Sequence, residues 1–326
     1  MAGPAQPPCS LCMAPVCLVV GASSALVLRD QGSVGPEGDH GHDASFSQAS
    51  RYEALTQLRR FLRLGTWRGH QPPPKPQGGL MTAFQFLPGA DNDLMVVLLD
   101  GFGLFRGSTL LSVPRASQRL VAFLALHGGM VRRAAVAGTL WPDASERHAY
   151  SNLRQALARL QRTARKALAA SKLELGLAEG VTVDIRHART LARRLLDPAV
   201  TPEQSELGTA AVGVLSAELL PDWYDDWLLL EAEDWRQLRL HALEGLAARL
   251  AAAGRWGDAV GAACAAVRAD PLRESARACL IQVHLAEGNQ SEAVREFARY
   301  QALLHGDLGL EPTSRLRHLI EGLHSS

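Results

Sequence analysis

The sequence lacks acidic residues over an unusually long stretch. Between Glu146 and Glu174 there is no Asp or Glu, although the same stretch carries seven Arg and Lys residues. Ordinary surface helices mix charges of both signs, because like charges three or four residues apart repel each other. The pattern is therefore typical of a helix that binds a polyanion or an acidic partner.

Recognisable catalytic motifs are also absent. The sequence has no G-x-x-x-x-G-K-[ST] phosphate loop, no H-E-x-x-H metal motif and no G-x-S-x-G nucleophile motif. Asp225 and Asp226 stand at the expected start of a helix, where capping of the helix explains both carboxylates. We therefore expect that the chain is not an enzyme and that it holds no cofactor.

Cysteine is scarce, and no metal site is expected. Five cysteines are too few and too scattered for a disulfide framework, which favours reduced thiols in the cytosol. Cys9 and Cys12 form a C-x-x-C pair, but no second pair stands at the spacing of a zinc ribbon. The GDHGHD segment at residues 38–43 has metal-binding side chains, yet its glycine-rich context favours a solvated loop.

The first 90 residues form an N-terminal extension with little core pattern. Residues 9–28 are apolar and uncharged over about the length of a membrane span, so an anchor is one interpretation. No Lys or Arg precedes this segment, and it contains Gly, Pro and three Ser, which argues against a signal peptide. We expect residues 1–80 to be disordered, or not to be translated because the true start is Met81, and we expect no membrane interaction.

The formal net charge of +1 hides a division of the chain into a basic part and an acidic part. Residues 101–172 hold twelve Arg and Lys against two acids, whereas residues 173–326 hold fifteen basic residues against 23 acids. Such an asymmetry is expected when a nucleic-acid-binding domain is joined to a domain that binds other partners.

Residues 91–196 show the element pattern of a winged helix-turn-helix domain. Short apolar runs with glycine turns from residue 94 predict a small antiparallel sheet. Helices are expected at 115–127, stopped by two glycines, and at 132–140, ended by Trp141 and Pro142. The acid-poor segment 145–172 is expected to be the third helix, followed by a hairpin of strands 173–177 and 181–185.

A helical projection of the third helix separates an apolar face from a polar face. Its apolar arc holds Leu153, Leu157, Leu160, Ala164 and Leu168. Its opposite side interleaves Arg with Asn and Gln, the amides that read adenine, so a recognition helix in a major groove explains the pattern better than an ordinary solvated face. The residues expected to contact base edges are His148, Asn152, Gln155 and Arg159. The residues expected to contact phosphates are Arg154, Arg162, Arg165, Lys166 and Lys172.

Residues 208–326, after the linker-like segment 197–208, contain an internal repeat. GRWGDAV at 254–260 and GNQSEAV at 288–294 lie 34 residues apart, which is the period of the tetratricopeptide repeat. Ala259 and Ala293 are expected to let paired helices approach closely. A preceding helix with Trp223, Trp227 and Trp235 is expected to cap the stack. The predicted fold class is mainly α: a winged helix-turn-helix domain with small antiparallel sheets, then an all-α domain of tetratricopeptide-like repeats.

Two blocks of the sequence resemble a known family, in the family's order. The first block resembles the signature of winged-helix activators of the SARP (antibiotic regulatory protein) type and reads LWPDASERHAYSNLRQALARLQR. The DNA-binding domain of these activators is similar to that of OmpR-type response regulators. The C-terminal block resembles the bacterial transcriptional activator domain, and the two together cover residues 94–323. The resemblance implies binding to direct repeats near promoters, recruitment of RNA polymerase, and a place in the bacterial cytoplasm at the nucleoid.

Two functions of different classes remain open at this point. The first is a sequence-specific transcriptional activator that binds double-stranded promoter DNA. Two copies are then expected to associate head to tail on direct repeats, with a monomer free in solution. The alternative is a tetratricopeptide-like adaptor that binds proteins and has no sequence-specific DNA binding.

Overall fold

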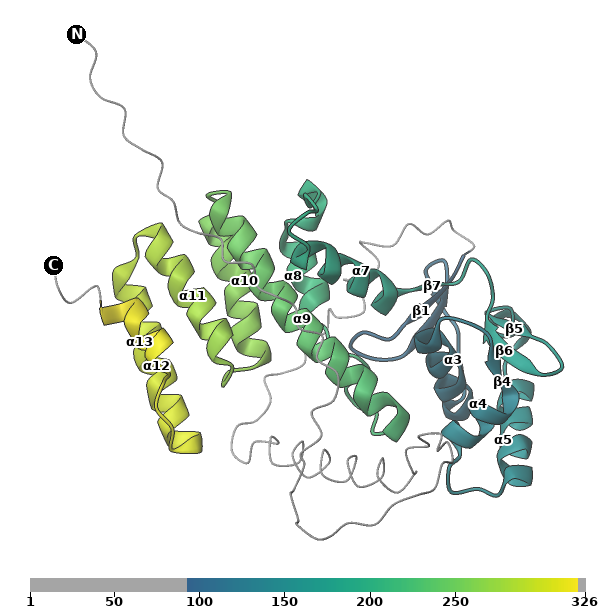
Figure 1. Ribbon diagram of the computed structural model, residues 1–326. Coiled ribbons are helices and arrows are strands. Elements are labelled where there is room, and N and C mark those ends of the chain that lie inside the picture. The colour runs from purple at the N-terminus through teal and green to yellow at the C-terminus, as the bar shows by residue number, and fades with distance from the viewer. Residues whose placement is uncertain (1–92, 322–326) are drawn as a thin grey trace, which may run out of the picture. The chain divides into compact units, whose positions relative to one another are not determined.

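The computed structural model describes residues 93–321, which belong to one compact unit of the chain. The N-terminal extension, its apolar segment 9–28, and the candidate metal motifs at Cys9 and at 38–43 lie outside the described residues. Figure 1 shows two small sheets with short helices in the first part of the described chain, followed by a series of helices only. The predicted fold class is confirmed.

The first sheet has four strands in the order β3-β2-β1-β7. The strands β1 (Leu94–Val97), β2 (Gly103–Arg106) and β3 (Thr109–Leu110) are antiparallel neighbours, as the glycine turns between them predict. Strand β7 (Thr182–Val183), 85 residues after β1, pairs in parallel with β1 in the register Val96↔Val183.

Three helices build the core of the helix-turn-helix. They are α3 (Arg115–His127), α4 (Arg133–Leu140) and α5 (Glu146–Ala158). The bounds predicted for α3 are confirmed, and α4 begins one residue later than predicted. Gly128, the C-cap residue of α3, adopts the left-handed conformation. The buried side chains of this core include Leu120, Phe123, Leu124, Val136, Leu140 and Leu153.

The third helix is much shorter than predicted. Helix α5 ends at Ala158, Gln161 is extended, and a single turn, α6 (Arg162–Arg165), follows before strand β5 (Leu168–Ala170). The burial prediction holds where the helix prediction is wrong: Leu157 packs in the core of α3 and α4, whereas Leu160 packs in a second core together with β1 and α7. Helix α5 therefore ends between two apolar residues that pack in different clusters.

The predicted terminal hairpin is also wrong in its pairing. Strand β6 (Glu174–Leu177) matches the expected strand 173–177, but its partners are β5 and β4 (Val131–Arg132), in the order β4-β6-β5. Residues 182–183 join the other sheet, because Val183 and Ile185 are buried against β1 in the second core. Gly176 permits the close approach of β6 to the residues before β4, since a Cβ there would lie 2.7 Å from the Met130 sulfur.

The segment after β7 forms α7 (Asp184–Leu196), the 3₁₀ turn η2 (Gln204–Glu206) and α8 (Thr209–Ser216). Arginine side chains from neighbouring helices hold the linker-like segment between α7 and α8 in place: Arg194 pairs with Glu206, and Arg255 donates to the Leu207 carbonyl oxygen. The Arg249 guanidinium donates to the carbonyl oxygens of Leu195, Asp197 and Val200 at 2.6 to 3.3 Å.

The C-terminal helices are α9 (Asp226–Ala252), α10 (Trp256–Ala269), α11 (Glu274–Glu287), α12 (Gln290–Leu308) and α13 (Ser314–Glu321). Consecutive helices from α9 to α12 pack against each other, as Figure 1 shows. The predicted repeat is confirmed: Gly254 separates α9 from α10, Gly288 separates α11 from α12, and Ala259 and Ala293 are fully buried. None of the helices in residues 93–321 is both long and apolar enough to span a membrane.

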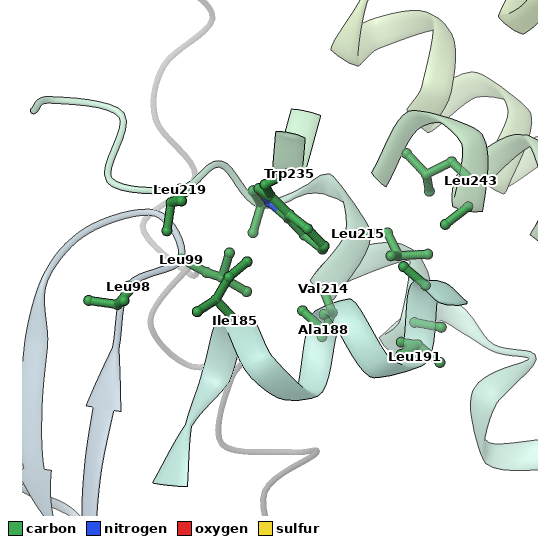
Figure 2. Packing of buried hydrophobic residues seen from close by; sticks show 14 of the residues in the cluster. Leu98, Leu99, Ile185, Ala188, Leu191, Val214, Leu215, Leu219, Trp235 and Leu243 are labelled. Atoms are coloured by element: carbon green, nitrogen blue, oxygen red, sulfur yellow. The ribbon is translucent and has the colours of Figure 1, made fainter. Parts of the chain in front are cut away.

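A continuous hydrophobic cluster joins the winged domain to the helical repeats. Figure 2 shows Ile185 and Ala188 of α7 beside Leu99, which follows β1, and Val214 of α8. Asp184, at the start of α7, is buried, and its carboxylate accepts the backbone N–H groups of Leu98 and Leu99 at 2.9 to 3.0 Å. The two parts therefore share one core.

Candidate nucleic-acid interface

The outward face of α5 carries the residues expected to contact base edges. His148, Asn152 and Gln155 stand at helical positions i, i+4 and i+7, and Arg159 continues the same line as the C-cap residue. His148, Gln155 and Arg159 are exposed, and Asn152 is half-buried. The buried residues of α5, such as Leu153 and Ala156, lie on the opposite side.

The start of α5 is organised around Ser145. Ser145 is the N-cap residue, and its hydroxyl lies 2.9 Å from Nδ1 of His148. This contact leaves Nε2 of the imidazole pointing away from the hydroxyl, where it is free to meet a base edge or a phosphate. His148 is therefore held at the N-terminal end of the helix.

Helix α3 fixes the position of α5. The Ser117 hydroxyl is fully buried and donates to the Ala156 carbonyl oxygen at 2.7 Å. Ala156 lies in the last turn of α5, where carbonyl groups have no partner within the helix. Arg119, two residues further on α3, donates to the Leu140 carbonyl oxygen at the end of α4.

The residues expected to contact phosphates are spread over three elements rather than along one helix. Arg154 lies on α5 beside the line of His148, Asn152 and Gln155, as predicted. Arg162 and Arg165 lie on the single turn α6, and Lys166 is its C-cap residue. Their predicted place on the third helix is therefore wrong, because α5 ends before them. Lys172 lies in the turn between β5 and β6, which we call the wing tip (residues 171–173).

The wing tip is tied to the start of α4. The Arg133 guanidinium donates twice to the Ser171 carbonyl oxygen, at 3.1 and 2.9 Å, and the Arg133 backbone N–H donates to the Leu173 carbonyl oxygen. The Ser171 hydroxyl accepts the backbone N–H groups of Leu173 and Glu174. These bonds hold Lys172 on a defined turn.

The basic side chains of this region have no acidic partner within the described part of the chain. The seven are Arg147, Arg154, Arg159, Arg162, Arg165, Lys166 and Lys172, and all are exposed. In the C-terminal part, by contrast, arginines are commonly paired, as in Arg255 with Asp258 at 2.6 Å and Arg273 with Glu244 at 2.9 Å. The positive charge of the winged domain is thus available to an external anion.

Two exposed residues of the same surface were not predicted from the sequence. Arg147 lies on α5 in line with Arg154, seven residues later. Leu173 at the wing tip has 76% of its surface exposed. The spacing of Arg147 and Arg154 was a usable signal, whereas Leu173 was expected to lie inside a strand.

Aromatic and charged residues at the start of α9 contact the winged domain. The Trp227 ring meets the Phe123 ring of α3 edge to face, with centroids 5.5 Å apart, and Arg115 lies over the Trp223 ring at 4.0 Å. Asp225 is the N-cap residue of α9, but its side chain makes no capping bond and pairs instead with Arg119. The capping explanation is therefore wrong for Asp225, whose carboxylate links the two parts.

Other chemistry is limited among the described residues. Cys264 and Cys279 are free thiols, and burial raises the pKa of the Cys279 thiol to about 12, so it is not a reactive nucleophile at neutral pH. No group of three or more His, Cys, Asp or Glu side chains with metal-binding geometry occurs within residues 93–321.

The C-terminal part of the chain is similar to a known protein family. Residues 183–324 match the family model of the bacterial transcriptional activator domain. The match begins at β7 and includes α7, which the expected boundaries assign to the winged domain.

Among solved structures, Mycobacterium tuberculosis EmbR in complex with a low affinity phosphopeptide is similar, with 23% sequence identity and a TM-score of 0.49. The similarity covers 71% of this chain and 65% of the EmbR chain, so it spans less than two thirds of that protein. No curated protein sequence matches the chain. Residues 183–324 of this chain are therefore similar to the bacterial transcriptional activator domain, in agreement with the resemblance predicted for the C-terminal block.

Proposed function

We propose that this protein is a transcriptional activator that binds promoter DNA through its winged domain, with α5 in the major groove. The observation that carries the proposal is the exposed basic surface formed by α5, α6 and the wing tip. Its seven basic side chains have no acidic partner among the described residues, and they surround a line of amide and imidazole side chains. Unpaired cations supply affinity for phosphates, and amides supply base readout.

In this proposal, α5, α6 and the wing tip make different contacts with DNA. Asn152 and Gln155 reach base edges from the exposed side of α5, because an amide pairs bidentately with adenine. Arg162 and Arg165 on α6 contact phosphates beyond the end of α5, together with Lys166. Lys172 at the wing tip contacts the backbone of the neighbouring groove.

The proposal assigns a different function to each of the two domains. Residues 91–196 bind DNA, and residues 208–326 present the helical repeats, with α7 packed against both. By analogy with the family, the protein binds direct repeats near promoters as head-to-tail copies and recruits RNA polymerase in the bacterial cytoplasm. A recognition helix reads only a few base pairs, which is why two copies are needed for useful specificity.

The test is gel retardation of DNA from the gene's own upstream region by the full chain. The full chain is required because residues 90–195 alone would expose the α7 side chains that pack on α8 and α9. We expect retardation at low salt and a steep fall in affinity as salt rises, because phosphate neutralisation releases counterions.

A matched pair of triple variants locates the binding surface. Arg162→Ala/Arg165→Ala/Lys166→Ala should lower the salt slope by roughly 0.9 for each lost phosphate contact. Arg295→Ala/Arg315→Ala/Arg317→Ala removes the same charge from exposed positions of α12 and α13 and should leave the slope unchanged. Absence of retardation by the wild-type chain at low salt would favour the protein-binding adaptor. Equal effects of the two variants on the salt slope would show that α6 is not part of the DNA-binding surface.

A further inference from the structure

A cavity of about 450 Å³ lies along α7, next to the junction of the winged domain and the helical repeats. Its apolar wall is formed by Leu99, Ala188, Leu191 and Val214, which come from three separate elements. Figure 2 shows these four side chains gathered around α7. The volume and the apolar wall are typical of pockets that bind small organic molecules.

The carboxylates that line the cavity already have hydrogen-bond donors from the protein. Both oxygens of Asp184 accept backbone N–H groups, from Leu98, Leu99 and Ile185. Both oxygens of Glu206 accept donors from Arg194, and one also accepts the Glu203 backbone N–H. Neither carboxylate therefore offers a strong free acceptor to a ligand.

Arg186 and Arg194, which both line the cavity, keep unused donors on their guanidinium groups. Arg186 gives its Nε and one terminal nitrogen to the Ala125 carbonyl oxygen, at 3.1 and 2.8 Å, and forms no ion pair with any residue in 93–321. Burial lowers the pKa of Arg186, in agreement with a half-buried cation that lacks an acidic partner. Arg194 uses Nε and Nη2 on Glu206, which leaves Nη1.

An apolar wall combined with surplus cationic donors defines the chemistry of a ligand. We propose that this cavity binds an amphipathic organic anion, with its ring or acyl body against Leu99, Leu191 and Val214 and its anionic oxygen atoms on Arg186. A charge-assisted hydrogen bond to a guanidinium is about twice as strong as a neutral one, so the anionic group orients the molecule.

The position of the cavity connects such a ligand to the DNA-binding domain. Leu99 lies two residues after β1, and Arg186 binds the carbonyl group of Ala125 near the end of α3. Helix α3 in turn holds α5 through Ser117. A ligand in the cavity therefore touches the elements that fix the recognition helix to the helical repeats.

Two fluorescent probes of nearly equal shape test the proposal on the full chain without DNA, so the result does not depend on the proposed function. They are 1-anilinonaphthalene-8-sulfonate and N-phenyl-1-naphthylamine, which lacks the sulfonate. We expect saturable binding of the sulfonate at one site per chain, about tenfold tighter than that of the neutral probe. Lack of saturable binding, or equal affinity for the two probes, would overturn the proposal.

Substitutions assign the binding to this cavity. Thr190→Trp at its exposed rim and Val214→Phe on its wall should each weaken the sulfonate probe at least about tenfold by occupying the space. Gln282→Trp adds the same indole to an exposed position of α11 and should not change binding. Thr190 is exposed, so this variant is expected to fold even if Val214→Phe does not; wild-type affinity in Thr190→Trp would place the probe elsewhere.

A last variant tests the anionic group. Arg186→Gln should bring the affinity for the sulfonate down to that for N-phenyl-1-naphthylamine, while the affinity for the neutral probe stays at its wild-type value. Retention of the sulfonate preference in Arg186→Gln would contradict the assignment of the anion to this guanidinium.

Discussion

The Ser117 hydroxyl on α3 donates a hydrogen bond of 2.7 Å to the carbonyl oxygen of Ala156 in the last turn of α5. This bond satisfies a carbonyl group that the helix itself leaves without a partner. It also defines how the candidate recognition helix sits on the core of the winged domain.

Replacing Ser117 by Ala should therefore destabilise the protein. The variant leaves the Ala156 carbonyl unsatisfied in a buried place, which costs about 1–3 kcal/mol in the free energy of unfolding. Urea denaturation measures this loss. Ser216→Ala removes an exposed hydroxyl that binds the Val212 carbonyl within α8, and it serves as a control with a loss below about 0.5 kcal/mol. Equal losses in the two variants would show that the Ser117 hydrogen bond contributes no more to the free energy of unfolding than an exposed hydrogen bond.

The carboxyl group of Asp184 should make stability depend on pH. Burial raises its pKa from 3.8 to about 6, although the backbone N–H groups that bind it act in the opposite direction. The stabilising contribution of the protonated group is complete below about pH 4 and is lost as the pH rises through about 6. Between these limits the free energy of unfolding should fall by roughly 3 kcal/mol relative to Asp184→Asn, which cannot ionise. Denaturation of both proteins across this range is the measurement, and a constant difference would contradict the raised pKa.

Gln155 on α5 should carry sequence preference if the proposed function is correct. Gln155→Ala is expected to cost about 1–3 kcal/mol of binding free energy on the cognate site and almost nothing on scrambled DNA. Gln282→Ala, on an exposed position of α11, is the matched control and should change neither affinity. Fluorescence anisotropy with both DNAs measures the effect. Equal loss on both would mean that Gln155 contacts the backbone, and that α5 enters the groove at another angle.

Gly288 at the end of α11 should resist substitution by a β-branched residue. Its φ of 91° lies in the left-handed region, and a Cβ there would meet no atom within 4 Å, so only the backbone conformation opposes a side chain. Gly288→Val should lose about 1–3 kcal/mol in the free energy of unfolding, and Gly288→Asn should lose less because Asn tolerates this region. Thermal unfolding compares the two. Similar melting temperatures for Val and Asn would refute the backbone explanation.

Features that depend on local sequence were predictable. Helix α3 was predicted with its correct bounds because its apolar spacing and the two glycines after it act within one segment. The 34-residue repeat was predictable for the same reason, since Gly254 and Gly288 each end a helix by their own conformational freedom.

Features that depend on partners distant in the sequence were not predictable. No glycine or proline marks the end of α5 at Ala158, and the residues on either side of the break, Leu157 and Leu160, pack in different cores. Strand β7 pairs with β1, 85 residues away, rather than with its neighbour β6. Asp225 pairs with Arg119 of the winged domain instead of capping its own helix.

The sequence by itself determined the chemical character of the candidate interface. A stretch without acids but with seven cations and three amides is positively charged in any fold, so a polyanion or an acidic partner was predicted from composition and spacing. Only the tertiary structure decided which element carries each side chain: Asn152 and Gln155 remain on α5, while the later cations move to α6 and the wing tip. The physical reason is that charge is a property of residues, whereas the place where a helix ends depends on the cores its apolar side chains must fill.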